Sequence, residues 1–433
     1  MSEIHIKPWK FVSAHLGPNN PLPPLFPERK CPQINTKGIP QEIIKQMQVG
    51  HLPSILPYSM QSDYNRVSDH TETKVAILEN EILRATFLLE LGGRLWSLYH
   101  KPSGKELLEV NPVIQLANLG IRNAWFSGGV EWNIGTSGHS PFTCDRLFAA
   151  RLTREDGTPF LRLYEWERFR QVPFQIDVYL PPMSPTLFLY IRIFNPNETE
   201  VPMYWWSNIA VPDHPGTRVI TPGDTAYYLG LKPNQLAKVS IPFHGEVDLT
   251  YPKNYSSAAD IFFHIPNSHN PWIAAVDCDG KGLVHTSTQQ LIGRKMWTWG
   301  VESGGYNWQK FLSPPGKGYL EIQAGLTRTQ LEHTTIPAGS ELSWMEAYGM
   351  IETDPQKAHG SNWHQVQDTV QSAINKLIPS EKLYSEYERA QKYIHHKPDE
   401  VLQRGSGWGA LERLRRESDN ENQMCGPGLI FDD

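Results

Sequence analysis

Two glutamates stand in sequence settings that could support acid–base chemistry. Glu321 lies in Leu-Glu-Ile-Gln-Ala-Gly, which ends at Gly325. Glu131 lies in Gly-Gly-Val-Glu-Trp-Asn, which begins at Gly128 and is predicted to form a loop. When two carboxylates flank a sugar, one can protonate the leaving oxygen while the other activates water or attacks the anomeric carbon. Glycoside hydrolysis by Glu131 and Glu321 is therefore the leading hypothesis, provided that the fold brings both residues to one cleft.

Aromatic, amide and imidazole side chains near these glutamates could shape a sugar site. Indole rings pack against the C–H faces of pyranoses, and amides bind hydroxyl groups, although core packing is the more frequent role of any one tryptophan. His139 follows Gly138 in a predicted loop, so it could reach the cleft, whereas Lys295 favours a solvated edge. The candidate substrate-binding residues are Trp125, Trp132, Trp206, Asn208, Gln323, His139, His214 and Trp299.

Short β-like segments must position these side chains. Apolar and aromatic runs bounded by Gly, Pro and Asn predict strands over 75–78, 82–90, 94–99, 161–169, 174–179, 187–194, 201–206, 272–276, 318–324 and 340–349. So many short strands with few helical signals predict a mainly β chain, built as a large two-sheet sandwich. On such a strand Trp205 and Trp206 point to opposite faces, and Asn208 shares the face of Trp206.

The composition divides the chain into three parts. Residues 1–70 are predicted to form an extension that wraps the core, because prolines crowd 18–27, with a short helix at 40–49. Residues 71–352 form the predicted sandwich. Residues 353–433 form a predicted helical region, with helices over 362–378, 380–394 and 400–416.

The end of the predicted sandwich resembles the end of galactose mutarotases and related aldose epimerases. Glu321 and Gln323 are followed by Pro337-Ala-Gly339 and a last strand, and Leu-Gly-Gly-Arg at 91–94 resembles the early hairpin of that fold. The resemblance implies a large antiparallel β-supersandwich of the galactose mutarotase-like type. It also implies that Glu321 takes the place of the catalytic base, with Gln323 as its neighbour.

The sequence departs from mutarotases at both of their essential histidines. Tyr-Trp-Trp-Ser-Asn-Ile-Ala, at 204–210, resembles the strand that carries one histidine but contains none, and His214 is the nearest. Ser127 stands where the resemblance would place the other. An aldose 1-epimerase, with Glu321 as base and His139 or His214 as the replacement acid, is therefore the alternative enzyme.

Three motifs also resemble an uncharacterised bacterial family in which a mutarotase-like domain precedes tetratricopeptide-type helices. They are Gly-Gly-Val-Glu-Trp-Asn, Tyr-Trp-Trp-Ser-Asn and Glu-Ile-Gln-Ala-Gly. The resemblance covers roughly 71–350 and names no substrate. A non-catalytic sugar-binding or sensing module, whose helical part docks a partner, therefore stays open as a third class.

Several function classes find no support in the sequence. The net charge of −6, without a basic stripe, argues against nucleic acid, and the four scattered cysteines argue against a disulfide framework or zinc site. No dinucleotide, P-loop, zinc-protease or serine-hydrolase motif occurs. The sequence also shows no signal peptide and no apolar run that could span a bilayer. We expect a cytoplasmic location, an oligosaccharide or monosaccharide partner, no cofactor, no metal and no membrane partner, and leave homo-oligomerisation open.

Overall fold

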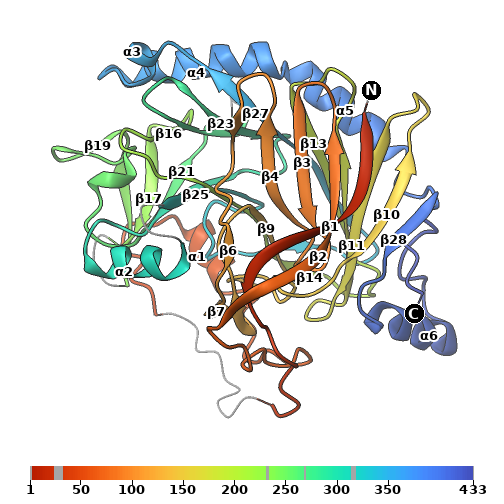
Figure 1. Ribbon diagram of the computed structural model, residues 1–433. Coiled ribbons are helices and arrows are strands. Elements are labelled where there is room, and N and C mark those ends of the chain that lie inside the picture. The colour runs from red at the N-terminus through yellow and green to blue at the C-terminus, as the bar shows by residue number, and fades with distance from the viewer. Residues whose placement is uncertain (1, 24–32, 231–233, 268–269, 314–317, 433) are drawn as a thin grey trace.

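The computed structural model describes residues 2–23, 33–230, 234–267, 270–313 and 318–432, and these form a two-sheet β-sandwich with helices on its outside (Figure 1). Part of the predicted proline-rich stretch, with Pro24, Pro27 and Cys31, lies outside the described residues. The predicted mainly β, two-sheet architecture is confirmed.

The first sheet has 13 strands and carries the candidate site. Its strands pair antiparallel except for β1 with β6, and a short strand, β5 (Lys105–Glu106), pairs beside β4. The spatial order is β18 (Leu236–Ser240), β17 (Thr225–Leu229), β21 (Ala259–His264), β24 (Gly293–Thr298), β25 (Tyr319–Gly325), β15 (Trp205–Pro212), β9 (Val130–Ile134), β4 (Arg94–His100), β3 (Leu83–Leu88), β2 (Ser68–Glu79), β1 (Glu3–Ala14) and β6 (Val113–Ile114).

The second sheet has nine antiparallel strands. Their order is β16 (Arg218–Ile220), β22 (Trp272–Val276), β23 (Lys281–Ser287), β27 (Glu341–Glu352), β13 (Thr186–Phe194), β12 (Val172–Tyr179), β11 (Pro159–Glu167), β10 (Phe148–Thr153) and β28 (Glu400–Gln403). Three further hairpins pair β14 (Val201–Met203) with β26 (Thr334–Ile336), β19 (Phe243–His244) with β20 (Val247–Asp248), and β7 (Ala117–Gly120) with β8 (Asn123–Trp125).

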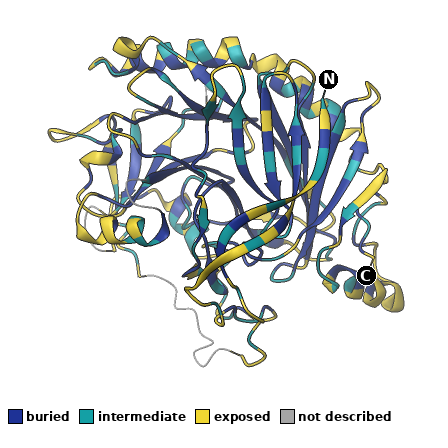
Figure 2. Ribbon diagram, in the orientation of Figure 1, coloured by how far each residue is buried: buried dark blue, intermediate teal, exposed yellow. Residues whose placement is uncertain are grey.

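The main core lies between the two sheets, where alternate side chains of each strand interdigitate. In β15, Trp205 and Ile209 point into this core, while Trp206 and Asn208 point to the outer face, as the two-residue period of a strand requires. Figure 2 shows the buried strands in the interior and the exposed residues on the helices and loops. The first sheet therefore has an outer face that is free to build a site.

Helices lie on the outside of both sheets. The helices are α1 (Gln41–Met47), α2 (Ser303–Leu312), α3 (Pro355–Ala358), α4 (Trp363–Leu377), α5 (Ser380–Gln391) and α6 (Trp408–Asp419), with a 3₁₀ turn at Pro252–Asn254. Both α4 and α5 pack on β27, along the top of Figure 1, and α6 lies near the C-terminus. This cover explains why strands such as β12 are buried on both faces.

The C-terminal region is fixed to the second sheet by a buried arginine, Arg162. Arg162 makes two bonds of 2.7 Å to Asp177, and both side chains are fully buried. Arg162 also donates to the carbonyls of Tyr393, His396 and Gly428. Such bidentate, charge-assisted bonds are strong and directional. The predicted helix over 400–416 is wrong at its start, because Glu400–Gln403 forms an edge strand on β10 and the helix begins at Trp408.

Residues within the predicted N-terminal extension take part in the first sheet. Glu3–Ala14 forms the 12-residue strand β1, which pairs with β2 along its whole length. Its side chains include Phe11 and Ala14 in a small apolar cluster. The short helix predicted at 40–49 is found as α1, and Ile43 on this helix is buried. The three-part division of the chain stays a prediction.

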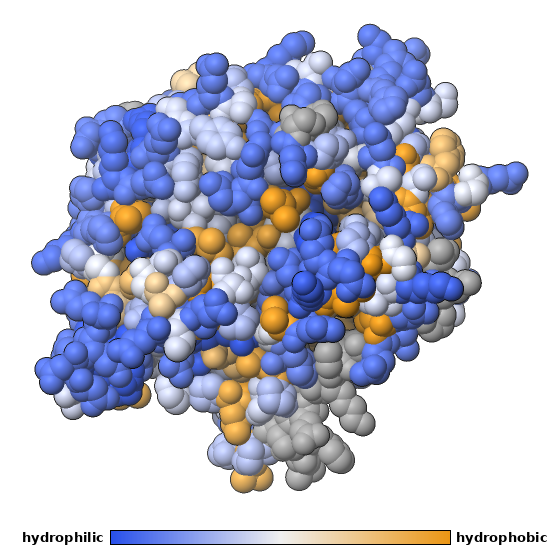
Figure 3. All heavy atoms as spheres, turned by 180° about the vertical axis from the view of Figure 1, so that it is seen from behind, coloured by the Kyte–Doolittle hydropathy of each residue, from blue (hydrophilic) through white to orange (hydrophobic). Residues whose placement is uncertain are grey.

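Figure 3 shows mostly hydrophilic residues on the face seen from behind, with hydrophobic residues in small separate groups. Among the described residues no helix is both long and apolar enough to cross a membrane.

Candidate active site

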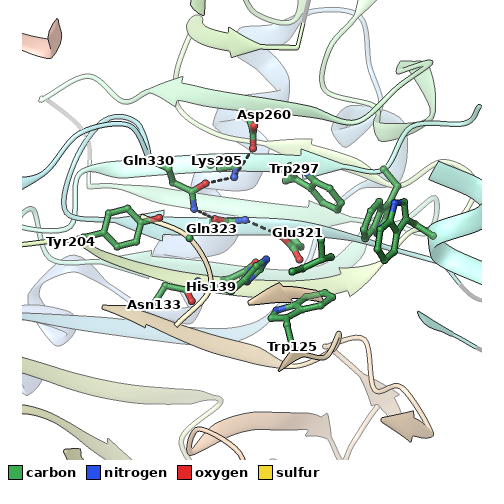
Figure 4. Close-up of a pocket in the computed structure, with 15 residues that line it drawn as sticks. Trp125, Asn133, His139, Tyr204, Asp260, Lys295, Trp297, Glu321, Gln323 and Gln330 are labelled. Atoms are coloured by element: carbon green, nitrogen blue, oxygen red, sulfur yellow. Dashed lines mark hydrogen bonds and ion pairs between the residues drawn. The ribbon is translucent and has the colours of Figure 1, made fainter. Parts of the chain in front are cut away.

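A cavity of about 260 Å³ opens on the outer face of the first sheet. Strands β15, β24, β25 and β21 form its floor, and loops and α2 form its walls (Figure 4). Its lining combines tryptophans with carboxylate, amide, imidazole and ammonium groups. The lining residues are Leu119, Trp125, Asn133, Gly138, His139, Tyr204, Asn208, Asp260, Lys295, Trp297, Trp299, Trp308, Glu321, Gln323 and Gln330.

Strand register brings these polar side chains together from distant parts of the sequence. Directly opposed residues on neighbouring strands point to the same face. One cross-strand row consists of Glu131, Asn208, Gln323 and Lys295. The next row consists of Ala210, Glu321, Trp297 and Asp260. Glu131 and Glu321 therefore lie on the same face of the sheet, as a shared site requires. The predicted loop around Glu131 is wrong, however, because Glu131 belongs to strand β9.

Glu131 lies beneath His139 rather than in the lining of the cavity. Its Oε2 accepts a 3.1 Å hydrogen bond from Trp125 Nε1 and lies 2.7 Å from His139 Nδ1. Arg94 Nη2 lies 3.6 Å from Oε1. The side chain of His139 is 25% exposed, against 5% for Glu131. The imidazole is therefore the part of this group that a ligand can reach.

The charges around Glu131 keep it ionised. Burial by itself would raise the pKa of Glu131, but the neighbouring His139 and Arg94 outweigh burial and hold that pKa at about 2. Arg94 is itself fixed by bonds to the carbonyls of Phe126 and Gly128 and to the Thr143 hydroxyl. A permanently ionised Glu131 can hold the imidazole in one orientation, as a carboxylate does in a catalytic triad.

A turn at Gly138 presents His139 to the cavity. Gly138 has a φ of +111°, a conformation that side-chain-bearing residues rarely adopt. The backbone N–H of Ser140 donates a 2.7 Å hydrogen bond to Asn133 Oδ1, which fixes the loop to strand β9 just after the histidine. The His139 ring also packs on Trp125, with 4.7 Å between ring centroids.

Glu321 occupies the floor of the cavity at the end of a polar chain. Its Oε2 accepts a 2.9 Å hydrogen bond from Gln323, and Gln330 Nε2 donates to Gln323 Oε1 at 2.6 Å. Lys295 donates to Gln330 and forms a 2.6 Å ion pair with Asp260. Figure 4 shows these contacts as one series of dashed lines.

The environment of Glu321 differs from that of Glu131 in its effect on titration. Burial raises the pKa of Glu321, and the charges of His139 and Lys295 offset only part of that increase. Its nearest hydrogen-bond donor is a neutral amide rather than a cation. Environments that push the pKa values of two neighbouring acids apart are typical of acid–base sites.

The walls of the cavity supply flat apolar surfaces, and the floor supplies an unpaired hydrogen-bond acceptor on Asn208. Trp297 and Trp299 meet edge to face at 4.3 Å, and Trp299 stacks on Trp308 at 5.7 Å. Asn208 Oδ1 is buried and has no hydrogen-bond partner among the described residues. Because an unsatisfied buried acceptor is costly, a ligand hydroxyl at this point would be favoured.

The structure brings most of the sequence candidates to this cavity. It contains Trp125, Asn208, Gln323, His139, Trp299 and Glu321 in its lining. Trp132 is not among them, because it points into the core, where it stacks on Trp205 and donates to the Gly93 carbonyl. His214 lies apart, in a different cavity beside Lys105 and Asp277.

Trp206 shares the outer face with Asn208 but is sealed from the cavity. A Cβ atom at Gly325 would come within 2.2 Å of the Trp206 ring, and one at Gly293 within 2.7 Å. The ring thus lies over these glycines, packs against Phe262 and is fully buried. It cannot serve as a sugar platform in this conformation.

Several lining residues were missed from the sequence. Lys295 was expected at a solvated edge but is only 3% exposed, since the ion pair with Asp260 and the bond to Gln330 hold it in the floor. Alternation along β24 and β21 could have indicated Lys295 and Asp260, since each occupies the outer face of its strand. No sequence signal would have placed Gln330 or Trp308 there. Among the described residues no group of three or more His, Cys, Asp or Glu could hold a metal ion.

The model of a family described as a domain of unknown function, DUF5107, matches residues 51–343. In structure, the chain is similar to a TPR-domain containing protein from Parabacteroides distasonis, with a TM-score of 0.66 and 21% identity. That match covers 81% of this chain but 55% of the other, so the chain spans about half of the protein that it matches.

Structures described as a putative mutarotase and as a galactose mutarotase-like protein also match. A putative mutarotase from Salmonella typhimurium matches with a TM-score of 0.48 and 11% identity, over 65% of this chain and 91% of that one. A galactose mutarotase-like protein from Clostridium acetobutylicum matches with a TM-score of 0.48 and 10% identity, over 65% and 96%.

Proposed function

Starting from the fact that this chain belongs to the DUF5107 family, we propose that it interconverts the anomers of a sugar by proton transfer between His139, Glu321 and the anomeric centre. The observation that carries the proposal is that these two side chains line one cavity, with Glu131 holding His139 from beneath. The tryptophan walls and the free acceptor of Asn208 suit a ring with one apolar face and several hydroxyls.

In the proposed reaction the sugar ring opens and closes again. The Glu321 carboxylate takes the proton from the anomeric hydroxyl while the protonated His139 gives a proton to the ring oxygen. The bond between C1 and the ring oxygen breaks, and its electron pair stays on that oxygen. Rotation about C1–C2 turns the other face of the aldehyde, and the reverse transfers close the ring as the second anomer. Atoms, protons and electrons balance without a co-reactant.

The environment of each group fits its proposed role. Glu131 occupies Nδ1 of His139, so proton exchange with a ligand would use Nε2. The raised pKa of Glu321 makes its carboxylate a stronger base than an ordinary glutamate. The pair is also close enough to interact electrostatically, since the charge of His139 lowers the pKa of Glu321. Glu131 is a positioning residue in this account.

The hydrolase that the two carboxylates predict fits this geometry less well. Hydrolysis would need Glu131 or another acid to touch the glycosidic oxygen or a water beside it. Glu131 lies outside the lining, its Oε2 is already bonded to His139 and Trp125, and its pKa of about 2 leaves no proton to donate. Asp260 lines the cavity but is paired with Lys295.

A sugar panel tests the proposal. Exchange between α and β anomers of D-glucose, D-galactose, D-xylose, D-mannose and L-arabinose would be followed by saturation-transfer NMR, with gluco-oligosaccharides and xylo-oligosaccharides assayed for cleavage in parallel. We expect faster exchange with at least one free sugar, lost in Glu321→Gln. Cleavage of an oligosaccharide without faster exchange would favour the hydrolase. Binding without either reaction would favour a sensing module.

A further inference from the structure

A second and larger cavity adjoins the first along the outer face. Its volume is about 560 Å³, and it lies between the β7–β8 hairpin, α2 and the segment that precedes β2. It contains neither His139 nor Glu321. Its lining residues are Tyr64, Arg66, Leu116, Ala117, Asn118, Asn123, Gly304, Asn307, Trp308 and Phe311.

The two cavities share a wall. Trp308 of α2 lines both of them. On β7, the side chain of Leu119 lines the first cavity and that of its neighbour Asn118 lines the second. The same holds on β8, where Trp125 lines the first and Asn123 the second. The two cavities therefore lie side by side, on either side of Trp308 and the β7–β8 hairpin.

A continuous series of aromatic contacts runs from one cavity to the other. Trp297 contacts Trp299 at 4.3 Å, and Trp299 stacks on Trp308 at 5.7 Å. Trp308 in turn meets Phe311 edge to face at 6.1 Å. The guanidinium of Arg66 lies over the Phe311 ring, 5.2 Å from its centroid, at the far end.

The second cavity also offers hydrogen-bonding groups. The amides of Asn118, Asn123 and Asn307 each carry donors and an acceptor, which suit sugar hydroxyls. Asn123 has a φ of +89°, in the left-handed region that residues other than glycine seldom adopt and that is often maintained at ligand sites. Aromatic rings interleaved with amides would present both surfaces that a pyranose recognises.

From this adjacency and the series of aromatic contacts, we propose that both cavities form one groove for a reducing oligosaccharide. The unit whose anomeric carbon reacts occupies the first cavity, and the following unit lies against Trp308 and the asparagines of the second. The first cavity, of about 260 Å³, is below the roughly 300–1,000 Å³ usual for ligand pockets, so a longer ligand must extend beyond it. This inference rests on the proposed function, because that function places the unit with the reacting anomeric carbon in the first cavity.

The experiment is calorimetric titration of the full chain with gluco-, xylo-, manno- and galacto-oligosaccharides of one to four units. In at least one series we expect the dimer to bind about tenfold more tightly than the monomer, the gain that one additional aromatic contact typically gives. Trp308→Ala and Asn307→Ala should each reduce that gain. Tyr306→Ala is the matched control, because Tyr306 lies on the same helix, is 64% exposed and lines neither cavity.

The outcomes separate this inference from the proposed function. A gain with length in a protein that does not accelerate anomer exchange would support the groove and remove the epimerase. Accelerated exchange with equal affinity for monomers and longer members would overturn the groove alone. Absence of any gain in every series, or a gain that Trp308→Ala and Asn307→Ala leave intact, would also overturn it. Asn307 is exposed, so its variant keeps the test valid if Trp308→Ala fails to fold.

Discussion

The protein holds one histidine–glutamate pair in its core and another at its cavity. In the core, His285 Nε2 lies 3.0 Å from Glu346 Oε2, and both side chains are fully buried. At the cavity, His139 Nδ1 lies 2.7 Å from Glu131 Oε2, and the histidine side chain is 25% exposed. The same two residue types thus form a sealed pair in one region and an accessible pair in the other.

The two pairs also differ in what surrounds the carboxylate. Glu346 accepts further hydrogen bonds from Ser207, Trp344 and Tyr348, at 2.7–2.9 Å. Burial alone would raise the pKa of Glu346, but His285 and these donors outweigh burial and lower that pKa. In the part of the chain that the structure describes, no second acid is bonded to Glu346. At the cavity, Glu321 provides a second acid. A histidine–glutamate pair therefore belongs to the core where both side chains are fully buried, and is equipped for chemistry where the imidazole faces a cavity beside another carboxylate.

The largest expected effect is on the cavity side. Glu321→Gln keeps the shape of the side chain but removes the base, so we expect anomer exchange to slow about a thousandfold, within the range for one acid–base group. Saturation-transfer NMR with the most reactive sugar measures this rate. Glu165→Gln is a matched control, because Glu165 is also buried but lies in the second sheet away from the cavity, and it should keep the rate. A loss below tenfold would mean that Glu321 is not the base.

The core pair should respond in stability instead. In Glu346→Gln an amide N–H would face the four groups that now donate to Glu346. Because buried donors would then lack an acceptor, we expect a loss of about 3 kcal/mol in the free energy of unfolding. Urea denaturation measures this loss. Glu352→Gln, at an exposed carboxylate paired with Lys281, should change that free energy by less than about 0.5 kcal/mol. Equal stabilities for the two variants would remove the distinction between the core and cavity pairs.

Glu131→Gln sharpens the comparison, because it changes the cavity pair without touching the lining. We expect anomer exchange to slow by about a hundredfold, less than in Glu321→Gln, since the imidazole loses its orienting carboxylate but stays at the cavity. Saturation-transfer NMR at several sugar concentrations should show the loss in kcat rather than in KM, because Glu131 lies outside the lining of the cavity. A Glu131→Gln protein as fast as the parent would contradict this role.

The smallest expected effect is a shift in pH dependence. The base must be ionised, and the pKa of Glu321 is raised from 4.5, so exchange should be lost on the acid side at a pH above 4.5. The charge of Lys295 lowers that pKa, so replacing Lys295 and Asp260 together by Gln and Asn should move the acid limb further up. A limb at or below 4.5 in the parent protein would contradict the environment described for Glu321.

The fold was largely predictable because strand alternation and turn residues are local signals. Ten predicted strand segments correspond to strands of the two sheets, and the segment over 201–206 also contains β14 of a separate hairpin. The strand at Glu3–Ala14 was missed because its Lys, Trp and Pro residues suit an exposed edge more than a core. The segment around Glu131 was missed because its glycines indicated a loop.

The site was predictable most directly where two of its residues share a strand. Glu321 and Gln323 are two residues apart, so one strand places both on one face. Which tryptophans face the ligand could not be known, because Trp206 is sealed by contacts with Gly293 and Gly325 from other strands. The relation between Glu131 and His139 depends on a turn at Gly138, whose geometry the sequence does not specify.

The central claim is that His139 and Glu321 act together on one sugar. It is tested most directly by measuring anomer exchange in His139→Gln, Glu321→Gln and the double variant, with folding checked by circular dichroism. Groups that act in one concerted proton transfer lose activity as a unit. The account predicts that the double variant is about as slow as the slower single variant. Single losses that multiply in the double variant, or a His139→Gln protein as fast as the parent, would contradict it.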